Sequence, residues 1–276
     1  MHSMLRLNFI LSYTTLLLAL SCPGLSWAAQ SACGELKVAF YEHGAMYYLD
    51  QQQKPRGIDL DIIEELEKRS GCTFIRSIDS RIRIWTQLEQ ASLDMTVSSI
   101  VTAEREKYAQ FLMYITGRNY ALLQSNLAKS AYSLSGFLEH PELKLGVIKT
   151  FRHGAVFDQL VQQLRAQNRI VEVADYLSLY RIFKAKRVDA IIGLAISWGQ
   201  HEIRETYLSE AQIMDWAPHE HVEAGLALSR ARIPQSTVNL LQQHLKSMLQ
   251  DGTVLKIFRR HIGEPHASNS MLEAYR

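Results

Sequence analysis

Apolar and polar residues are arranged in two different patterns, and these patterns alternate along the chain. Short apolar runs stand at residues 36–40, 72–78 and 93–100, whereas residues 57–71 and 83–92 carry apolar side chains three or four positions apart. The first spacing is typical of buried strands, and the second is typical of helices with one apolar face. This alternation of strand and helix predicts a parallel sheet built from βαβ units.

The pattern begins again in the second half of the chain. It predicts strands and helices in alternation at residues 143–150, 155–166, 169–173, 178–186 and 188–197. A further strand around Gly225 leads into a long helix, which Asp251 and Gly252 separate from a last short one. We therefore expect an α/β protein with two lobes, each a mostly parallel sheet flanked by helices.

A short internal repeat supports the two-lobed reading. Trp85, Leu88, Leu93 and Asp94 align without a gap on residues 180, 183, 188 and 189, which are Tyr, Phe, Val and Asp. Each copy is a helix, a turn, and an Asp that opens a buried strand. The two aspartates could be read as an acid–base pair. Because both precede a strand, at the edge away from a cleft, we expect them to cap backbone groups instead.

The lobes are expected to be joined by two hinge crossings, near residues 117–124 and 217–226. Lobe 1 is then discontinuous and takes residues 29–118 and 224–266, and lobe 2 takes residues 119–223. Residues 267–276 are left as a C-terminal tail. Small-ligand sites are commonly found between two such lobes, so we expect a ligand cleft there.

The N-terminus has the features of a secretory signal. Arg6 precedes an apolar run from Leu7 to Leu20, and a Ser-Trp-Ala tripeptide predicts cleavage after Ala28. The run is too short for a membrane anchor. Cys22 follows a weak lipoprotein-like sequence in which Ala19 stands where leucine is usual, so we expect no lipid attachment. Residues 1–28 are thus predicted to be a signal peptide that exports the protein to the periplasm.

The composition excludes some classes of partner. A formal net charge of +2 gives no concentrated positive field for nucleic-acid binding. We expect a monomer with no cofactor. His219 and His221 stand at alternate positions, but without further ligands nearby they do not predict a metal site.

Two cysteines remain after the predicted signal peptide, Cys33 and Cys72, each just before a predicted strand. If these strands are parallel neighbours, the two cysteines lie at the same edge of one sheet. In an oxidising compartment an even pair favours a disulfide, and the alternative is two buried free thiols.

Arg105 raises a specific question about charge. Thr102 is expected to cap a helix, which would place Arg105 in its first turn, where the helix end already carries partial positive charge. Either the side chain lies in solvent, or an anion joins it, held by the guanidinium and free backbone N–H groups.

Several motifs, in order, resemble family 3 of the periplasmic solute-binding proteins, the amino-acid-binding subunits of ABC importers. Together they span nearly all of residues 33–265. They are "LKVAF" (36–40), "GIDLDIIEEL" (57–66), "LDMTVSSIVTAEREKYAQF" (93–111), "LKLGVIKT" (143–150), "AKRVDAIIG" (185–193) and "DGTVLKIFRRHIG" (251–263). The resemblance implies a type II periplasmic-binding fold that traps its ligand by closure. It also implies that Arg105 clamps the ligand's carboxylate, with backbone groups near Ser98 and Ser99 completing the anion site.

The chain departs from the family's pattern in its first lobe. The usual position of the aromatic platform falls on Gly44, with Tyr41, Tyr47 and Tyr48 around it. We expect a tyrosine, Tyr41 or Tyr47, to replace the platform, although each could be an ordinary loop residue. Ile100 stands where a hydroxyl residue often helps to bind the carboxylate.

The second lobe departs further. The family's aspartate that pairs with the ligand's ammonium group falls on Leu194, and a buried ammonium without a carboxylate partner is costly. Arg152 and His153 stand near the position of a small hydroxyl residue. Arg152 is either a second ligand-binding cation or a solvated loop residue. The resemblance implies a small carboxylate-bearing ligand, an amino acid or a related organic anion. These departures fit a carboxylate, a dicarboxylate or another anion better than a plain α-amino acid.

The resemblance implies a binding protein rather than an enzyme, serving an ABC permease or a membrane sensor. The competing class is a dehydratase on the same fold, for which Glu42, His43 or His153 could supply a general acid. Trp198 either lines the cleft or packs inside its lobe, and we expect packing.

Overall fold

The computed structural model describes residues 33–198, 205–264 and 266–275. The predicted signal peptide, its cleavage after Ala28 and the possible lipid attachment at Cys22 lie outside the described residues. Two five-stranded sheets organise the described chain, and both belong to one compact unit, residues 31–276.

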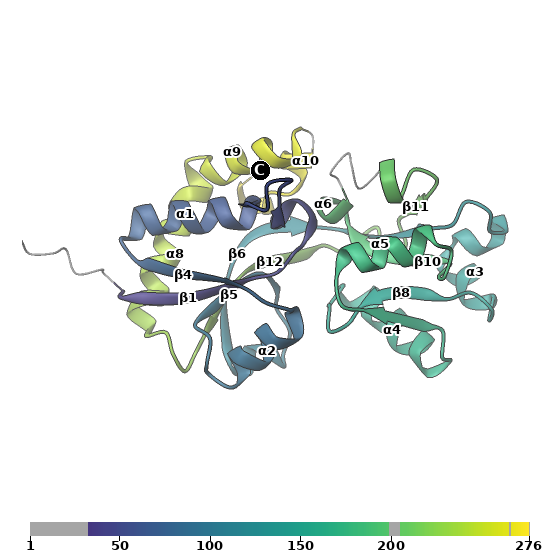
Figure 1. Ribbon diagram of the computed structural model, residues 1–276, viewed down its shortest axis with the longest axis horizontal. Coiled ribbons are helices and arrows are strands. Elements are labelled where there is room, and N and C mark those ends of the chain that lie inside the picture. Colours follow the sequence, from purple (N-terminus) through teal and green to yellow (C-terminus); the bar gives the residue numbers. More distant parts are fainter. Residues whose placement is uncertain (1–32, 199–204, 265, 276) are drawn as a thin grey trace, which may run out of the picture. The chain divides into compact units, whose positions relative to one another are not determined.

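The first sheet has the strand order β4-β1-β5-β12-β6 (Figure 1). β1 runs parallel to both β4 and β5, and β12 is antiparallel to β5 and β6. The strands are β1 (Glu35–Phe40), β4 (Thr73–Ile78), β5 (Met95–Ile100), β6 (Ala109–Gly117) and β12 (Val222–Ser229). A two-stranded ribbon, β2 (Tyr48–Leu49) and β3 (Pro55–Arg56), lies in the loop after β1.

The second sheet has the order β11-β7-β10-β8-β9. β8 runs parallel to β9 and β10, and β7 is antiparallel to β10 and β11. Its strands are β7 (Asn119–Leu123), β8 (Leu145–Ile148), β9 (Ile170–Val173), β10 (Ala190–Leu194) and β11 (Gln212–Met214).

Helices pack on both faces of each sheet, as the apolar pattern predicts. On the first sheet they are α1 (Ile58–Ser70), α2 (Arg81–Glu89), α8 (Gln235–Gln250) and α9 (Thr253–Ile262). On the second they are α3 (Leu134–Glu139), α4 (Ala155–Ala166), α5 (Tyr176–Lys184) and the short α6 (Ala195–Trp198). Short 3₁₀ turns lie at η1 (Gly44–Met46), η2 (Arg105–Lys107) and η3 (Lys129–Tyr132).

Helix α1 shows how the sequence determines an element. Ile58, Ile62, Ile63 and Leu66 lie fully buried on one face. Gly71 then ends the helix in the left-handed conformation (φ 70°), and its N–H donates to the carbonyl of Glu67. A residue with a β-carbon rarely adopts this conformation, so glycine gives a clean stop.

Two connections join the sheets. The first is Arg118, between β6 and β7, and its guanidinium forms an ion pair with Asp215, at the start of the second connection. One hydrophobic cluster contains residues of both sheets, including Leu226 of β12 and Ile191 of β10. A single hydrophobic cluster therefore includes residues from both sheets.

The capping role of the two repeated aspartates is confirmed. A carboxylate oxygen of Asp94 accepts the Lys37 N–H at 2.7 Å, and one of Asp189 accepts the Lys144 N–H at 2.7 Å. Each carboxylate therefore links the residue before one strand to the backbone of a parallel neighbour. The sequence repeat thus corresponds to equivalent positions in the two sheets.

The two cysteines after the predicted signal peptide form a disulfide. Cys33 and Cys72 precede the parallel neighbours β1 and β4, and their Cα atoms are 5.2 Å apart. The bridge therefore fastens the two strands at one edge of the first sheet, as expected from the sequence.

The expected helix after Thr102 is wrong. Thr102 does cap the following turn, since its hydroxyl accepts the Arg105 N–H at 3.2 Å, but the segment is only the three-residue turn η2 before β6 begins. The part of the chain expected as a C-terminal tail contains α10 (His266–Asn269) and η4 (Glu273–Tyr275), and Ala267 and Met271 are buried. The Ser270 carbonyl also accepts the Thr116 N–H near the end of β6.

Among the described residues, no helix is long and apolar enough to cross a membrane.

Candidate ligand-binding site

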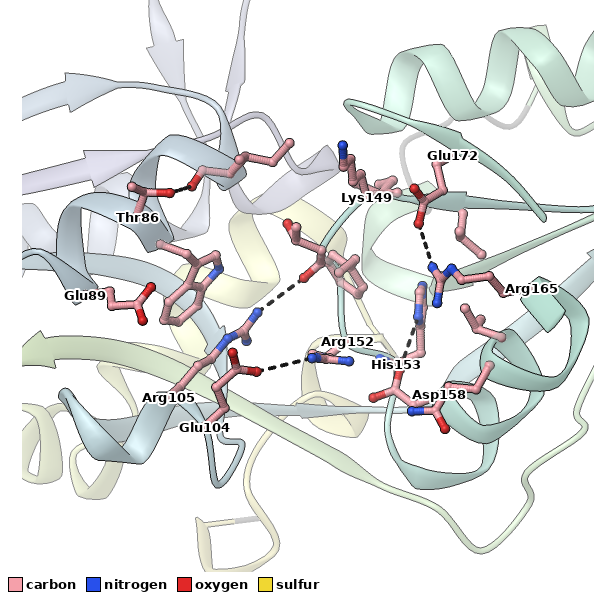
Figure 2. Close-up of a pocket in the computed structure, with 18 of the residues that line it drawn as sticks. Thr86, Glu89, Glu104, Arg105, Lys149, Arg152, His153, Asp158, Arg165 and Glu172 are labelled. Atoms are coloured by element: carbon pink, nitrogen blue, oxygen red, sulfur yellow. Dashed lines mark hydrogen bonds and ion pairs between the residues drawn. The ribbon is translucent and has the colours of Figure 1, made fainter. Parts of the chain in front are cut away.

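A pocket of about 410 Å³ lies where elements of the two sheets approach each other. Figure 2 shows Arg105 and Glu104 on one side of it, facing Lys149, Arg152, His153 and Asp158 on the other. The first wall comes from α2 and η2, and the second from β8, the loop after it, and α4. The pocket therefore lies in the interlobe position that the sequence predicts.

Arg105 lies in this pocket and is only 5% exposed. One guanidinium nitrogen donates to the Ile100 carbonyl at 3.0 Å, and the other to the Thr150 carbonyl at 3.3 Å. The guanidinium carbon lies 3.7 Å from the centre of the Trp85 ring. These contacts fix the side chain's orientation but supply no negative charge, and no described carboxylate forms an ion pair with it.

Burial is the main reason that the pKa of Arg105 is lowered, to about 9, and the neighbouring Arg81 contributes next. The side chain remains a cation at neutral pH, but no described carboxylate forms an ion pair with it. An anionic ligand would therefore gain a charge-assisted, two-pronged contact here.

The backbone beside Arg105 is strained. Thr150 is the second residue after β8. It is β-branched, yet it adopts a φ of 64°. Left-handed backbone of this kind costs about 1–2 kcal/mol. The strained residue is the one whose carbonyl meets Arg105, so the second sheet contributes to positioning this cation.

Arg152 also lines the pocket, as does His153. The Arg152 side chain is partly exposed and approaches Glu104 at 3.5 Å across the pocket (Figure 2). An ion pair this exposed adds little stability, so the arginine can exchange its partner at small cost.

Ser98 and Ser99 are buried but do not line the pocket. The Ser98 N–H donates to the Tyr114 hydroxyl at 3.0 Å, and the Ser98 hydroxyl donates to Asp59 at 2.7 Å. The Ser99 hydroxyl donates to the Val97 carbonyl at 3.0 Å. The Ser98 N–H, one of the backbone donors expected near the anion site, therefore already has a partner within the protein.

The tyrosines of the first loop lie in different surroundings. Tyr47 is a core residue whose ring stacks on Phe40, with ring centres 4.8 Å apart. Tyr41 is also buried, and its hydroxyl donates to the Ser98 carbonyl at 2.9 Å. Neither lines the pocket, although Tyr41 lies beside the cations described below.

Gly44 cannot provide an aromatic platform. It adopts φ 51°, and a β-carbon at this position would lie 2.5 Å from the Ser197 carbonyl oxygen of α6. Leu194, at the position of the family's ammonium-binding aspartate, is buried at the end of β10. Ile100 contributes only its carbonyl, which accepts from Arg105. Trp198 is buried and packs near Tyr120.

A buried polar and aromatic cluster lies beside the pocket, and no sequence pattern predicts that its members come together. It consists of Tyr41, His43, Arg81, Phe151 and Tyr176, and we call it the interlobe cluster. The His43 ring stacks on Tyr176, with centres 4.6 Å apart and planes within 8°, while Arg81 contacts Tyr41 and Phe151. Both ring nitrogens of His43 lack a hydrogen-bond partner in the described part of the chain.

The buried ionisable groups predict a pH effect on stability. Burial lowers the pKa of His43 to about 3, so His43 stabilises the fold above its unfolded pKa of about 6.5 and loses this contribution as pH falls. Burial raises the pKa of Asp59 to about 7, so its effect has the opposite sign: stability falls as pH rises from about 4 to 7.

We therefore expect the two slopes to oppose each other between about pH 4 and 6.5. Replacing His43 by phenylalanine removes one slope and keeps a ring for stacking. On going from pH 7 to pH 5, the wild-type protein should lose about 2 kcal/mol relative to His43→Phe. Urea unfolding of both proteins at the two pH values measures this, and a constant difference would contradict it.

The candidate general acids are poorly suited to catalysis. His43 is neutral near pH 7 and lies outside the pocket, and Glu42 is exposed in the first loop. His153 does line the pocket, with Nδ1 3.7 Å from Asp158, but burial lowers its pKa as well. A neutral imidazole is a weak proton donor at neutral pH.

Two α/β sheets, two connections and a pocket between them define a type II periplasmic-binding fold. The family described as bacterial extracellular solute-binding proteins, family 3, matches residues 36–264, and the chain belongs to that family. The resemblance found in the sequence motifs is thus confirmed. No curated protein matches the chain.

Solved structures with the same fold are distant in sequence. An ABC uptake transporter substrate-binding protein from Streptococcus pneumoniae with bound histidine has a TM-score of 0.70 at 14% identity, covering 83% of this chain and 93% of that one. A histidine kinase sensor domain has 0.69 at 13%, covering 83% and 96%. The ancestral amino-acid-binding protein AncCDT-1, a precursor of cyclohexadienyl dehydratase, has 0.66 at 19%, covering 83% and 95%.

Proposed function

We propose that this protein is a periplasmic solute-binding protein that captures a small carboxylate-bearing ligand, an amino acid or a related organic anion, between its lobes. The observation that carries the proposal is Arg105: a buried cation in the interlobe pocket with no carboxylate partner among the described residues. A ligand carboxylate would supply the missing charge and receive two parallel hydrogen bonds.

The ligand-bound protein would then deliver its ligand to an ABC permease. The substrate-binding protein from Streptococcus pneumoniae supports this role by its fold. The sensor domain of similar fold supports the alternative, in which the closed form signals to a membrane receptor. Both roles require the same first step, which is ligand capture by the two lobes.

Replacing Arg105 by glutamine tests this step. Charge-assisted hydrogen bonds contribute roughly 1.5–3 kcal/mol, so the affinity for the bound carboxylate should fall about 10–150-fold. A thermal-shift screen of organic acids and amino acids identifies the ligand, and calorimetry measures its affinity for both proteins. Lys107→Gln is the matched control, because Lys107 is an exposed cation in the same turn. Equal affinity in a folded Arg105→Gln protein would refute the carboxylate clamp.

A further inference from the structure

Arg81 is a second buried arginine next to the pocket. It is the first residue of α2 and is only 5% exposed. Its guanidinium carbon lies 4.3 Å from the ring centre of Tyr41 and 4.7 Å from that of Phe151. Its Nε has no hydrogen-bond partner within the described ranges. Phe151 lines the pocket and Arg81 does not, so Arg81 lies against the ring of a pocket residue.

The charges of Arg81 and Arg105 influence each other and the same neighbouring tyrosine. Each affects the pKa of the Tyr41 hydroxyl, and Arg81 is the neighbouring charge that most lowers the pKa of Arg105. No described carboxylate forms an ion pair with either arginine. Asp59 lies near Tyr41, but burial raises its pKa to about 7, so it compensates the two cations only in part.

Two buried positive charges without a counter-charge are costly. Aromatic rings stabilise a nearby cation by about 2 kcal/mol or more when desolvated, and carbonyl oxygens help Arg105, but neither neutralises the charge. Arg81 and Arg105 together carry two positive charges, and a single carboxylate could balance only one of them.

The acids around the pocket do not remove this shortage. Glu104 faces Arg152, and Glu172 forms an ion pair with Arg165 at 2.6 Å. Asp158 accepts the His153 backbone N–H at 2.9 Å and lies on the wall opposite Arg105 (Figure 2). The remaining acidic lining residue, Glu89, is exposed. At the position from which the family binds an ammonium group, this chain has the buried, apolar Leu194.

We propose that Arg81 is a second anion-binding residue, and that the ligand is a small dicarboxylate without an ammonium group. One carboxylate binds Arg105, and the Phe151 ring moves aside so that the other reaches Arg81. This inference rests on the proposed function, because it assumes the carboxylate clamp at Arg105. In the role of second cation, for which the sequence offered Arg152 as one of two readings, it places a buried arginine on the opposite wall.

The test compares matched acids on the purified protein. Calorimetry measures the affinities of succinate, glutarate and phthalate, each against the monocarboxylate of the same skeleton: butyrate, pentanoate and benzoate. Glutamate is included because it adds an ammonium group to glutarate. At least one dicarboxylate should bind at least about 30-fold more tightly than its monocarboxylate, since a second charged contact is formed. Glutamate should bind more weakly than glutarate.

Variants then assign the preference to Arg81. Arg81→Gln should reduce the preference to less than about 3-fold while leaving monocarboxylate affinity nearly unchanged, and Arg81→Lys should restore part of it. Arg83→Gln is the control, because Arg83 is a cation of the same helix whose side chain is 76% exposed. It should leave the preference intact. If Arg81→Gln does not fold, Arg81→Lys carries the assignment, and the absence of a dicarboxylate preference in the wild-type protein would still overturn the proposal.

The outcomes separate the two proposals. Monocarboxylates that bind as tightly as dicarboxylates, with affinity that depends on Arg105 but not on Arg81, would overturn the second site and leave the proposed function standing. Tighter binding of glutamate than of glutarate would also overturn it. Binding of no acid in this panel would overturn the dicarboxylate proposal, and binding of no organic acid or amino acid in the thermal-shift screen would overturn the proposed function as well.

Discussion

Loss of about 4 kcal/mol in the free energy of unfolding is expected when both Cys33 and Cys72 are replaced by serine. The bridge joins residues 39 positions apart, and a closed loop of this length restricts the unfolded chain by that amount in the chain-entropy model. It also fastens β1 to β4, the edge strand of the first sheet. Urea unfolding of the wild-type protein and the double variant measures the difference.

Reduction provides the control for this prediction. Dithiothreitol should shift the unfolding midpoint of the wild-type protein toward that of the double variant and leave the double variant unchanged. A wild-type midpoint that is insensitive to reductant, with both thiols shown to be free, would contradict the predicted contribution of the bridge.

A comparable loss, about 3–4 kcal/mol, is expected for Arg169→Met. Arg169 is almost fully buried just before β9, and its guanidinium donates to three backbone carbonyls, those of Leu143 at 2.8 Å, Leu138 at 3.1 Å and Phe137 at 2.7 Å. It thereby joins the end of α3 to the chain entering β8. Methionine keeps the apolar stem but removes all three charge-assisted bonds and leaves buried acceptors without this donor.

Arg165→Met is the matched control for Arg169→Met. Arg165 is a nearby arginine whose side chain is 53% exposed and forms a surface ion pair with Glu172. An exposed pair of this kind contributes about 0–1 kcal/mol. Similar losses in the two variants, measured by urea unfolding, would show that the buried carbonyl contacts of Arg169 are not the source of its effect.

The sequence predicted those parts of the fold that depend on local pattern. The apolar face of α1 and its glycine stop, the span of α4 and the two capping aspartates all follow from spacing along the chain. The features that the sequence did not predict depend on contacts between residues far apart in the chain. The turn at Arg105 stays short because β6 begins two residues beyond it, and the last residues are ordered by packing and by the bond from Thr116 to Ser270.

The binding site was predicted only in part for the same reason. Arg105 was found because a motif marks it, and the structure places it in the interlobe pocket. Arg81 was missed because it lies at the polar start of a helix, where an arginine is usually exposed. Its burial depends on Phe151, 70 positions away, and no local pattern reports that contact. The motif also marks Ser98 and Ser99, but the Ser98 N–H already donates to Tyr114 and the Ser98 hydroxyl to Asp59.

The close approach of Gly44 to Ser197 has an evolutionary consequence. An aromatic side chain at residue 44 would collide with the α6 backbone, and the left-handed conformation there would be strained as well. A single substitution therefore cannot restore the aromatic platform that the family usually has at this position. Recovery would require α6 to shift first, and such a shift would also disturb Tyr180, whose hydroxyl donates to the Ser197 carbonyl at 2.7 Å. An aromatic residue at position 44 therefore has to arise together with a rearrangement of α6.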